Sequence, residues 1–67
     1  MKTITFTPNS NNTPLENALS VLCAEADENK DFEIIDGEIV EYDLSEENDP
    51  IYWSVVESNE DSVMLDC

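Results

Sequence analysis

The chain has 67 residues, which is the size of one domain and leaves little room for a buried catalytic pocket. Seventeen Asp and Glu residues stand against two lysines, with no histidine, and the formal net charge is −15. This balance excludes direct binding to nucleic acid or to an anionic membrane surface, because both need several cationic side chains. A basic protein surface is the partner that the charge favours.

The first elements are a short strand and a helix. Residues 3–7 alternate polar and apolar side chains, as a strand does, and residues 8–12 form a polar loop. Thr13 suits the N-cap of a helix, Pro14 its first position, and Glu16 completes a capping box. Six residues with helical spacing predict its apolar stripe: Leu15, Ala18, Leu19, Leu22, Cys23 and Ala26. We therefore expect Cys23 to be a buried thiol and Cys67 a frayed terminal thiol.

The remaining elements are predicted to be strands. Residues 32–35 and 38–42 flank Asp36-Gly37, a strong signal for a β-hairpin. Residues 51–56 are the most strand-like segment, and residues 63–65 close the sheet. The order β-α-β-β-β-β predicts a single α+β domain over residues 1–67, with one helix packed on a four- to five-stranded antiparallel sheet. Alternation places Trp53 in the core and Tyr52 on the opposite face, half exposed or serving as an interface anchor.

Several function classes lack their usual residues. The chain has no histidine, no nucleophile-elbow serine and only one glycine, so we expect no enzymatic activity and no cofactor. The two cysteines form no CxxC pair, and we expect neither a signal peptide nor a membrane span. These features predict a cytoplasmic protein, and we expect it to be a monomer or a homodimer.

The acidic residues are concentrated in one part of the chain. Residues 1–24 contain only Glu16, and residues 25–67 contain the other sixteen. Carboxylates on strands and their loops can approach the charge density of a phosphate backbone. A solvated acidic face is the simpler interpretation, but such faces usually mix both signs. The candidate partner-binding residues fall into three groups. One row on the strands consists of Glu33, Glu38, Glu41 and Asp43. The loop clusters consist of Glu46, Glu47, Asp49, Glu57, Glu60 and Asp61, and the aromatic candidate is Tyr52.

Residues 42–50, Tyr-Asp-Leu-Ser-Glu-Glu-Asn-Asp-Pro, precede an aromatic-aliphatic strand. This stretch resembles the acidic loop and strand of the uracil-DNA glycosylase inhibitors. In its size and charge the chain also resembles other phage-encoded DNA mimics, the anti-restriction proteins and some anti-CRISPR proteins. The resemblance implies an inhibitor that occupies the nucleic-acid-binding site of a host defence effector or a DNA-processing enzyme, in the host cell cytoplasm if a phage encodes the chain. It names no target, and it leaves open whether DNA or RNA is mimicked.

Two alternatives remain. The chain could be an acidic regulatory module for a basic partner that binds no nucleic acid. It could also be a small calcium-binding protein, because five residues match a calcium-loop spacing: Asp27, Asn29, Asp31, Glu33 and Glu38. Against calcium, Phe32 stands where that loop needs a glycine, and a strand follows where a helix should begin.

The excess of like charge predicts that repulsion limits stability. Raising sodium chloride from low to moderate concentration should raise the melting temperature, because screening shortens to about 10 Å at 0.1 M. Thermal unfolding followed by circular dichroism checks this, and a flat or falling Tm would contradict a dense acidic surface. A rise specific to calcium would instead support the calcium loop.

Overall fold

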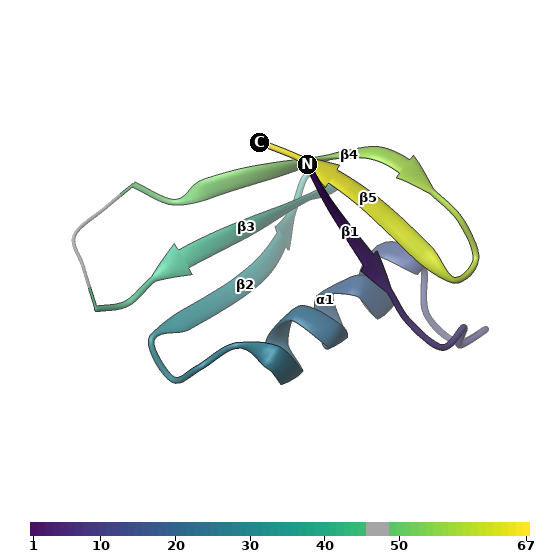
Figure 1. The fold of residues 1–67 in the computed structure, drawn as a ribbon, viewed down its shortest axis with the longest axis horizontal. Helices are drawn as coiled ribbons and strands as arrows, with labels where there is room; N and C mark the ends of the chain where they lie inside the picture. The colour runs from purple at the N-terminus through teal and green to yellow at the C-terminus, as the bar shows by residue number, and fades with distance from the viewer. Residues whose placement is uncertain (46–48) are drawn as a thin grey trace.

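Figure 1 shows the protein as a computed structural model, which describes residues 1–45 and 49–67. The described part contains one helix and an antiparallel five-stranded sheet in the order β1-β5-β4-β3-β2. This confirms the predicted α+β class and element order. No helix in these two ranges is long and apolar enough to cross a membrane. The elements are β1 (Lys2–Thr5), α1 (Pro14–Glu25), β2 (Lys30–Ile35), β3 (Glu38–Asp43), β4 (Ile51–Ser58) and β5 (Ser62–Asp66).

The start of α1 is set by the predicted capping box. The hydroxyl of Thr13 accepts a hydrogen bond from the backbone N–H of Glu16 at 3.2 Å. The Glu16 carboxylate accepts one from the backbone N–H of Thr13 at 2.9 Å. These two bonds satisfy N–H groups that a helix start would leave without partners. They also lower the pKa of Glu16 below its ordinary value of 4.5, because both favour the ionised carboxylate.

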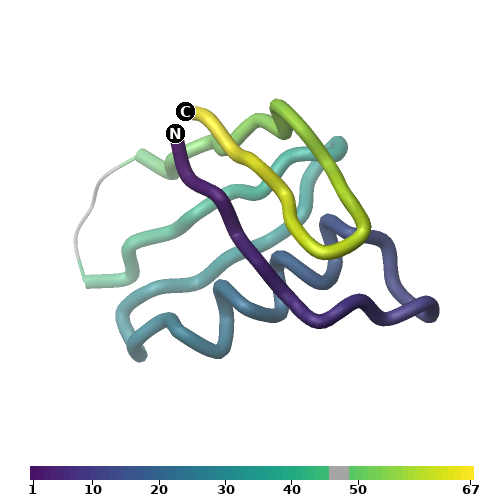
Figure 2. The backbone as a smooth tube through the Cα atoms, turned by 45° about the vertical axis from the view of Figure 1, so that its right-hand side comes forward, coloured from purple at the N-terminus to yellow at the C-terminus, as the bar shows by residue number. Residues whose placement is uncertain are grey.

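The sheet coils around α1, which lies against one of its faces (Figure 2). The helix contacts β1 and β5 near one edge of the sheet and β2 at the other edge. One helix can touch both edges only if the sheet is strongly twisted and curved. The core between them is formed by Ile4, Ala18, Leu22, Ile39, Val63 and Leu65.

The buried face of α1 differs from the predicted stripe. Ala18 and Leu22 are buried as expected, but Val21 packs against the core and Cys23 is exposed. The prediction of a buried Cys23 thiol is therefore wrong. Neighbouring residues of a helix are 100° apart, so a small rotation of the helix exchanges one flank of its stripe for the other. Cys67 is exposed, and both cysteines are free.

The hairpin between β2 and β3 is confirmed. Asp36 and Gly37 both have positive φ, 51° and 78°, as a two-residue type I′ turn requires. The turn pairs Ile35 with Glu38, and this fixes which residues of β2 and β3 share a face.

A β-bulge in β4 redirects one acidic side chain. Val55 pairs with Leu65, but Glu57 pairs with Met64, so Val56 is the extra residue. Without the bulge, strict alternation would place Glu57 on the same face as Trp53 and the core. The bulge moves this carboxylate to the other face, where it remains hydrated.

Replacing Gly37 by Ala should destabilise the protein by about 1–2 kcal/mol, the usual cost of a left-handed conformation for a residue with a Cβ. Steric crowding adds nothing, because no atom lies within 4 Å of the position of that Cβ. Gly37→Asn is the matched control, since Asn tolerates positive φ better. Urea unfolding measures both variants. Equal losses for Ala and Asn would mean that backbone conformation is not the cause.

Candidate protein-binding surface

The sheet face turned away from α1, here called the outer face, has no element packed on it in the described structure (Figure 1). Directly paired residues of antiparallel strands point to the same side, so the register assigns each side chain to a face. The core residues Ile39, Val63 and Leu65 mark the face against α1. Five carboxylates fall on the outer face: Asp31, Glu33, Glu38, Glu57 and Asp66.

The centre of the outer face is apolar. Val40 is 1% exposed, although it lies on the side away from α1. Its direct cross-strand neighbours are Glu33 on β2 and Tyr52 on β4, and Tyr42 follows two residues later on the same face. These longer side chains surround Val40 and shield it. Tyr52 is itself 57% exposed, which leaves an aromatic side chain open to solvent beside a desolvated centre.

Hydroxyl groups hold two of the outer-face carboxylates in place. Tyr42 donates a hydrogen bond to Glu33 at 3.0 Å, and Ser54 donates one to Glu38 at 2.9 Å. The bond to Glu33 raises the pKa of Tyr42, because it stabilises the neutral phenol, and burial and nearby charge add to the shift. A carboxylate has about four acceptor positions, so each retains capacity for further donors.

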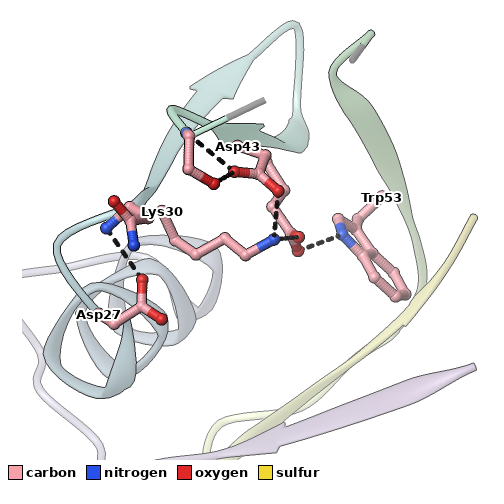
Figure 3. Close-up of polar contacts among 7 residues, drawn as sticks. Asp27, Lys30, Asp43 and Trp53 are labelled. Atoms are coloured by element: carbon pink, nitrogen blue, oxygen red, sulfur yellow. Dashed lines mark hydrogen bonds and ion pairs between the residues drawn. The ribbon is translucent and has the colours of Figure 1, made fainter. Parts of the chain in front are cut away.

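Lys30 is neutralised on the opposite side of the sheet, beside α1 (Figure 3). Its ammonium lies 3.5 Å from Glu41 and 3.4 Å from Asp43. Glu41 also accepts a hydrogen bond from the indole N–H of Trp53 at 3.3 Å, and its side chain is only 13% exposed. The pKa of Lys30 is raised chiefly by its hydrogen bond to Asp43. The pKa of Asp43 is lowered chiefly by two hydrogen bonds from Ser45, with Lys30 contributing less.

The second lysine is on the same side. Lys2 pairs with the core residue Leu65, and its ammonium lies 5.5 Å from the centre of the Trp53 ring, within the range of a cation–π contact. Both lysines of the chain therefore lie away from the outer face. The charged side chains on the outer face are therefore all carboxylates.

The predicted strand row does not form. Glu33 and Glu38 lie on the outer face, whereas Glu41 and Asp43 lie on the face against α1, because strand alternation separates the two pairs. That prediction is wrong, and its physical reason is the register set by the hairpin. The expected positions of Trp53 and Tyr52 on opposite faces are confirmed.

The described residues of the predicted loop clusters lie along and at the two ends of β4. Asp49 precedes the strand, and Glu60 and Asp61 follow it in the turn to β5 (Figure 1). The eight residues of β4 span up to about 25 Å at the rise of an extended strand. Glu57 lies on the outer face and not in the turn, and Glu46 and Glu47 lie outside the described residues. Of the described loop acids, Asp49 is therefore separated by the length of β4 from Glu60 and Asp61.

Sequence reasoning missed three residues of the outer face, Asp31, Tyr42 and Asp66. The signal for the first two was present. A two-residue Asp-Gly loop sets the register of its hairpin, so Asp31 could have been paired with Tyr42 by counting back from the turn.

The segment that matched a calcium loop has a different structure. Residues 30–35 form β2 and carry Phe32 towards the core, so the sharp loop that a calcium site needs is not formed. Asp27 instead accepts a hydrogen bond from the backbone N–H of Asn29 at 2.9 Å. No group of three or more acidic or cysteine side chains in the described residues is arranged to hold a metal ion.

A hollow of about 290 Å³ lies between the loop after β1 and the β4–β5 turn. Its lining includes Asn9, Asn12, Asn17 and a single ionisable side chain, Glu60. Asn12 donates a hydrogen bond to the buried Asn17 at 3.4 Å, so part of the lining is occupied in holding the loop to α1. This hollow is separate from the outer face.

Lys30→Gln should lower the melting temperature at neutral pH, because Glu41 and Asp43 lose their cation. The pKa of Lys30 is raised above 10.5 and that of Asp43 is lowered below 3.8. The contribution of this ion pair to stability is therefore fully present between these two values and is lost as pH falls through the lowered pKa of Asp43. The Tm difference from wild type should be largest near pH 7 and should shrink progressively in a pH series that runs down from 3.8. Lys2→Gln is the charge-matched control, and a Tm difference that does not shrink along the acid series would indicate packing of the lysine stem instead.

Comparisons with known proteins assign no family to this chain. No family model, no characterised protein and no solved structure matches it. The resemblance of residues 42–50 to glycosylase inhibitors is therefore a prediction that these comparisons leave untested. The function has to be argued from the charge and geometry of the outer face.

Proposed function

We propose that this protein is a non-enzymatic inhibitor that binds a basic protein in place of a nucleic-acid phosphate backbone. The observation that supports this most strongly is the separation of charge. Lys30 and Lys2 are both engaged on the α1 side of the sheet, and the outer face carries five carboxylates and neither lysine. A face that served only to keep the protein hydrated would ordinarily mix both signs.

The geometry of a sheet suits this role. Carboxylates two residues apart on a strand are about 6.5–7 Å apart, and neighbouring strands are about 4.8 Å apart. Each strand of duplex DNA carries one charge per about 3.4 Å of its axis. A protein whose Lys and Arg side chains are spaced for phosphates could therefore pair with several outer-face carboxylates at once.

Binding to such a partner would also relieve a cost within the protein itself. A net charge of −15 on 67 residues disfavours the folded state through repulsion. A cationic groove neutralises that charge and releases the counterions that both surfaces hold in solution, and this release is the term that drives non-specific DNA binding. The expected targets are host defence effectors and DNA-processing enzymes, which present such grooves.

The second candidate is an acidic regulatory module that binds a basic partner with no nucleic-acid site. The apolar centre at Val40 with exposed Tyr52 favours it, because aromatic anchors beside a desolvated centre are typical of protein–protein interfaces in general. The two candidates differ in one respect that can be measured. A mimic and a nucleic acid exclude each other from the partner, whereas a module and a nucleic acid do not.

The test begins with the partner, isolated on immobilised full-length chain from a nuclease-treated bacterial lysate and then purified. Fluorescence anisotropy follows a labelled duplex, and separately a labelled single strand, bound to this partner while the chain is added. We expect the chain to displace one of the two probes fully from the partner. The inhibition constant for this displacement should equal the dissociation constant of the complex between the chain and the partner. The dissociation constant of the chain from its partner should rise steeply as the salt concentration is raised from about 50 to about 200 mM. A ternary complex of partner, chain and nucleic acid would rule out mimicry and support the regulatory module.

A further inference from the structure

We propose that the outer face is the docking surface, and that it takes arginine side chains of a basic partner over Val40, between Tyr52 and Glu33. This inference rests on the proposed function, which requires a basic partner. It goes further by assigning the surface to one side of the sheet and the recognition to guanidinium groups.

The first argument is the order of side chains across three strands. Glu33, Val40 and Tyr52 are consecutive cross-strand neighbours on β2, β3 and β4. Adjacent strands are about 4.8 Å apart, so an acid and an aromatic ring flank a shielded apolar centre at about 10 Å from one another. A planar guanidinium can stack on the ring and bond the carboxylate, whereas a lysine ammonium is a point charge without a stacking face.

The second argument is pre-organisation. Tyr42 holds Glu33, and Ser54 holds Glu38, through hydroxyl hydrogen bonds of 3.0 and 2.9 Å. Both carboxylates are built on paired strands, so less side-chain entropy is lost when a partner binds them than for acids in loops. Each also has acceptor capacity for a bidentate arginine contact. Asp49, Glu60 and Asp61 lie outside the strands, so they have no such arrangement across neighbouring strands.

The third argument excludes a second copy of the chain as the occupant. Two outer faces brought together would oppose five carboxylates to five, on molecules that each carry a net charge of −15. Like charges placed opposite one another cost free energy, and no lysine on this face offsets them. A cationic partner is the complementary occupant.

The experiment compares two probes of equal charge, a decaarginine and a decalysine peptide, titrated into the full chain at fixed salt by calorimetry. We expect the arginine peptide to bind about two- to fivefold tighter for one exposed ring contact. Tyr52→Leu should bring the ratio towards one, and Tyr52→Trp should raise it, because Trp gives the strongest cation–π contact. Circular dichroism confirms that each variant is folded.

Charge is tested with two matched pairs of substitutions. Glu33→Gln with Glu38→Gln should weaken both peptides more than Glu25→Gln with Glu28→Gln, which removes the same charge from the C-terminal end of α1 and the loop after it. Gln retains an acceptor oxygen for Tyr42 and Ser54, so the local hydrogen bonds can persist. Backbone amide shifts in the NMR spectrum should change most on β2, β3 and β4.

Three outcomes would overturn the docking surface. The first is an equal loss of peptide affinity from the two pairs of substitutions. The second is a ratio of arginine-peptide to lysine-peptide affinity that does not change in the Tyr52 variants. The third is a concentration-dependent dimer, seen by sedimentation, that buries the outer face. The first two leave displacement of nucleic acid from the partner untouched, so the proposed function would stand with a different surface. If displacement fails while the arginine peptide maps to the outer face, mimicry is wrong and the docking surface stands.

Discussion

Lys30 reaches from the first position of β2 to Glu41 and Asp43 on β3, and Glu41 in turn accepts a hydrogen bond from Trp53. These contacts join the end of the β2–β3 hairpin to β4 on the side of the sheet where α1 packs. They also pair the one cation of residues 25–67 with two of the acids in that part of the chain. Because Lys2 lies over the same Trp53 ring, all the positive side-chain charge is gathered on one side of the sheet.

The two sides of the sheet consequently carry different chemistry. Beside α1, carboxylates are paired with cations, an indole or backbone N–H groups, and contribute to holding the fold together. On the outer face, Glu33 and Glu38 meet only hydroxyl donors among the described contacts, which orient a carboxylate without neutralising it. An oriented and uncompensated carboxylate is what a cationic partner needs, because no internal ion pair has to be broken before it binds.

The β-bulge in β4 decides which face Glu57 occupies. Regular alternation would bring Glu57 to the same face as Trp53, and the bulge at Val56 shifts the register with β5 and moves Glu57 to the outer face. The extra residue, Val56, is 53% exposed. A local change of register thus adds a carboxylate to the acidic surface.

Much of the fold could be predicted from local signals in the sequence. The capping box at Thr13 and Glu16, the Asp36-Gly37 turn and the apolar alternation of β3 and β4 each act over a few residues, and each appears in the structure. The excess of acid and the absence of balancing cations were likewise properties of composition alone. Together these properties of the sequence predict an α+β domain and a basic partner.

The candidate site depended on contacts between distant segments. Which acids share a face is set by strand register, so Glu41 and Asp43 separate from Glu33 and Glu38, and the bulge reverses the position of Glu57. The exposure of Cys23 follows from how α1 rotates against a sheet whose curvature is a property of all five strands. Local patterns determined the elements and the sign of the surface. The tertiary structure decided which charges are neutralised and which are presented, because pairing across the sheet joins residues that the sequence keeps apart.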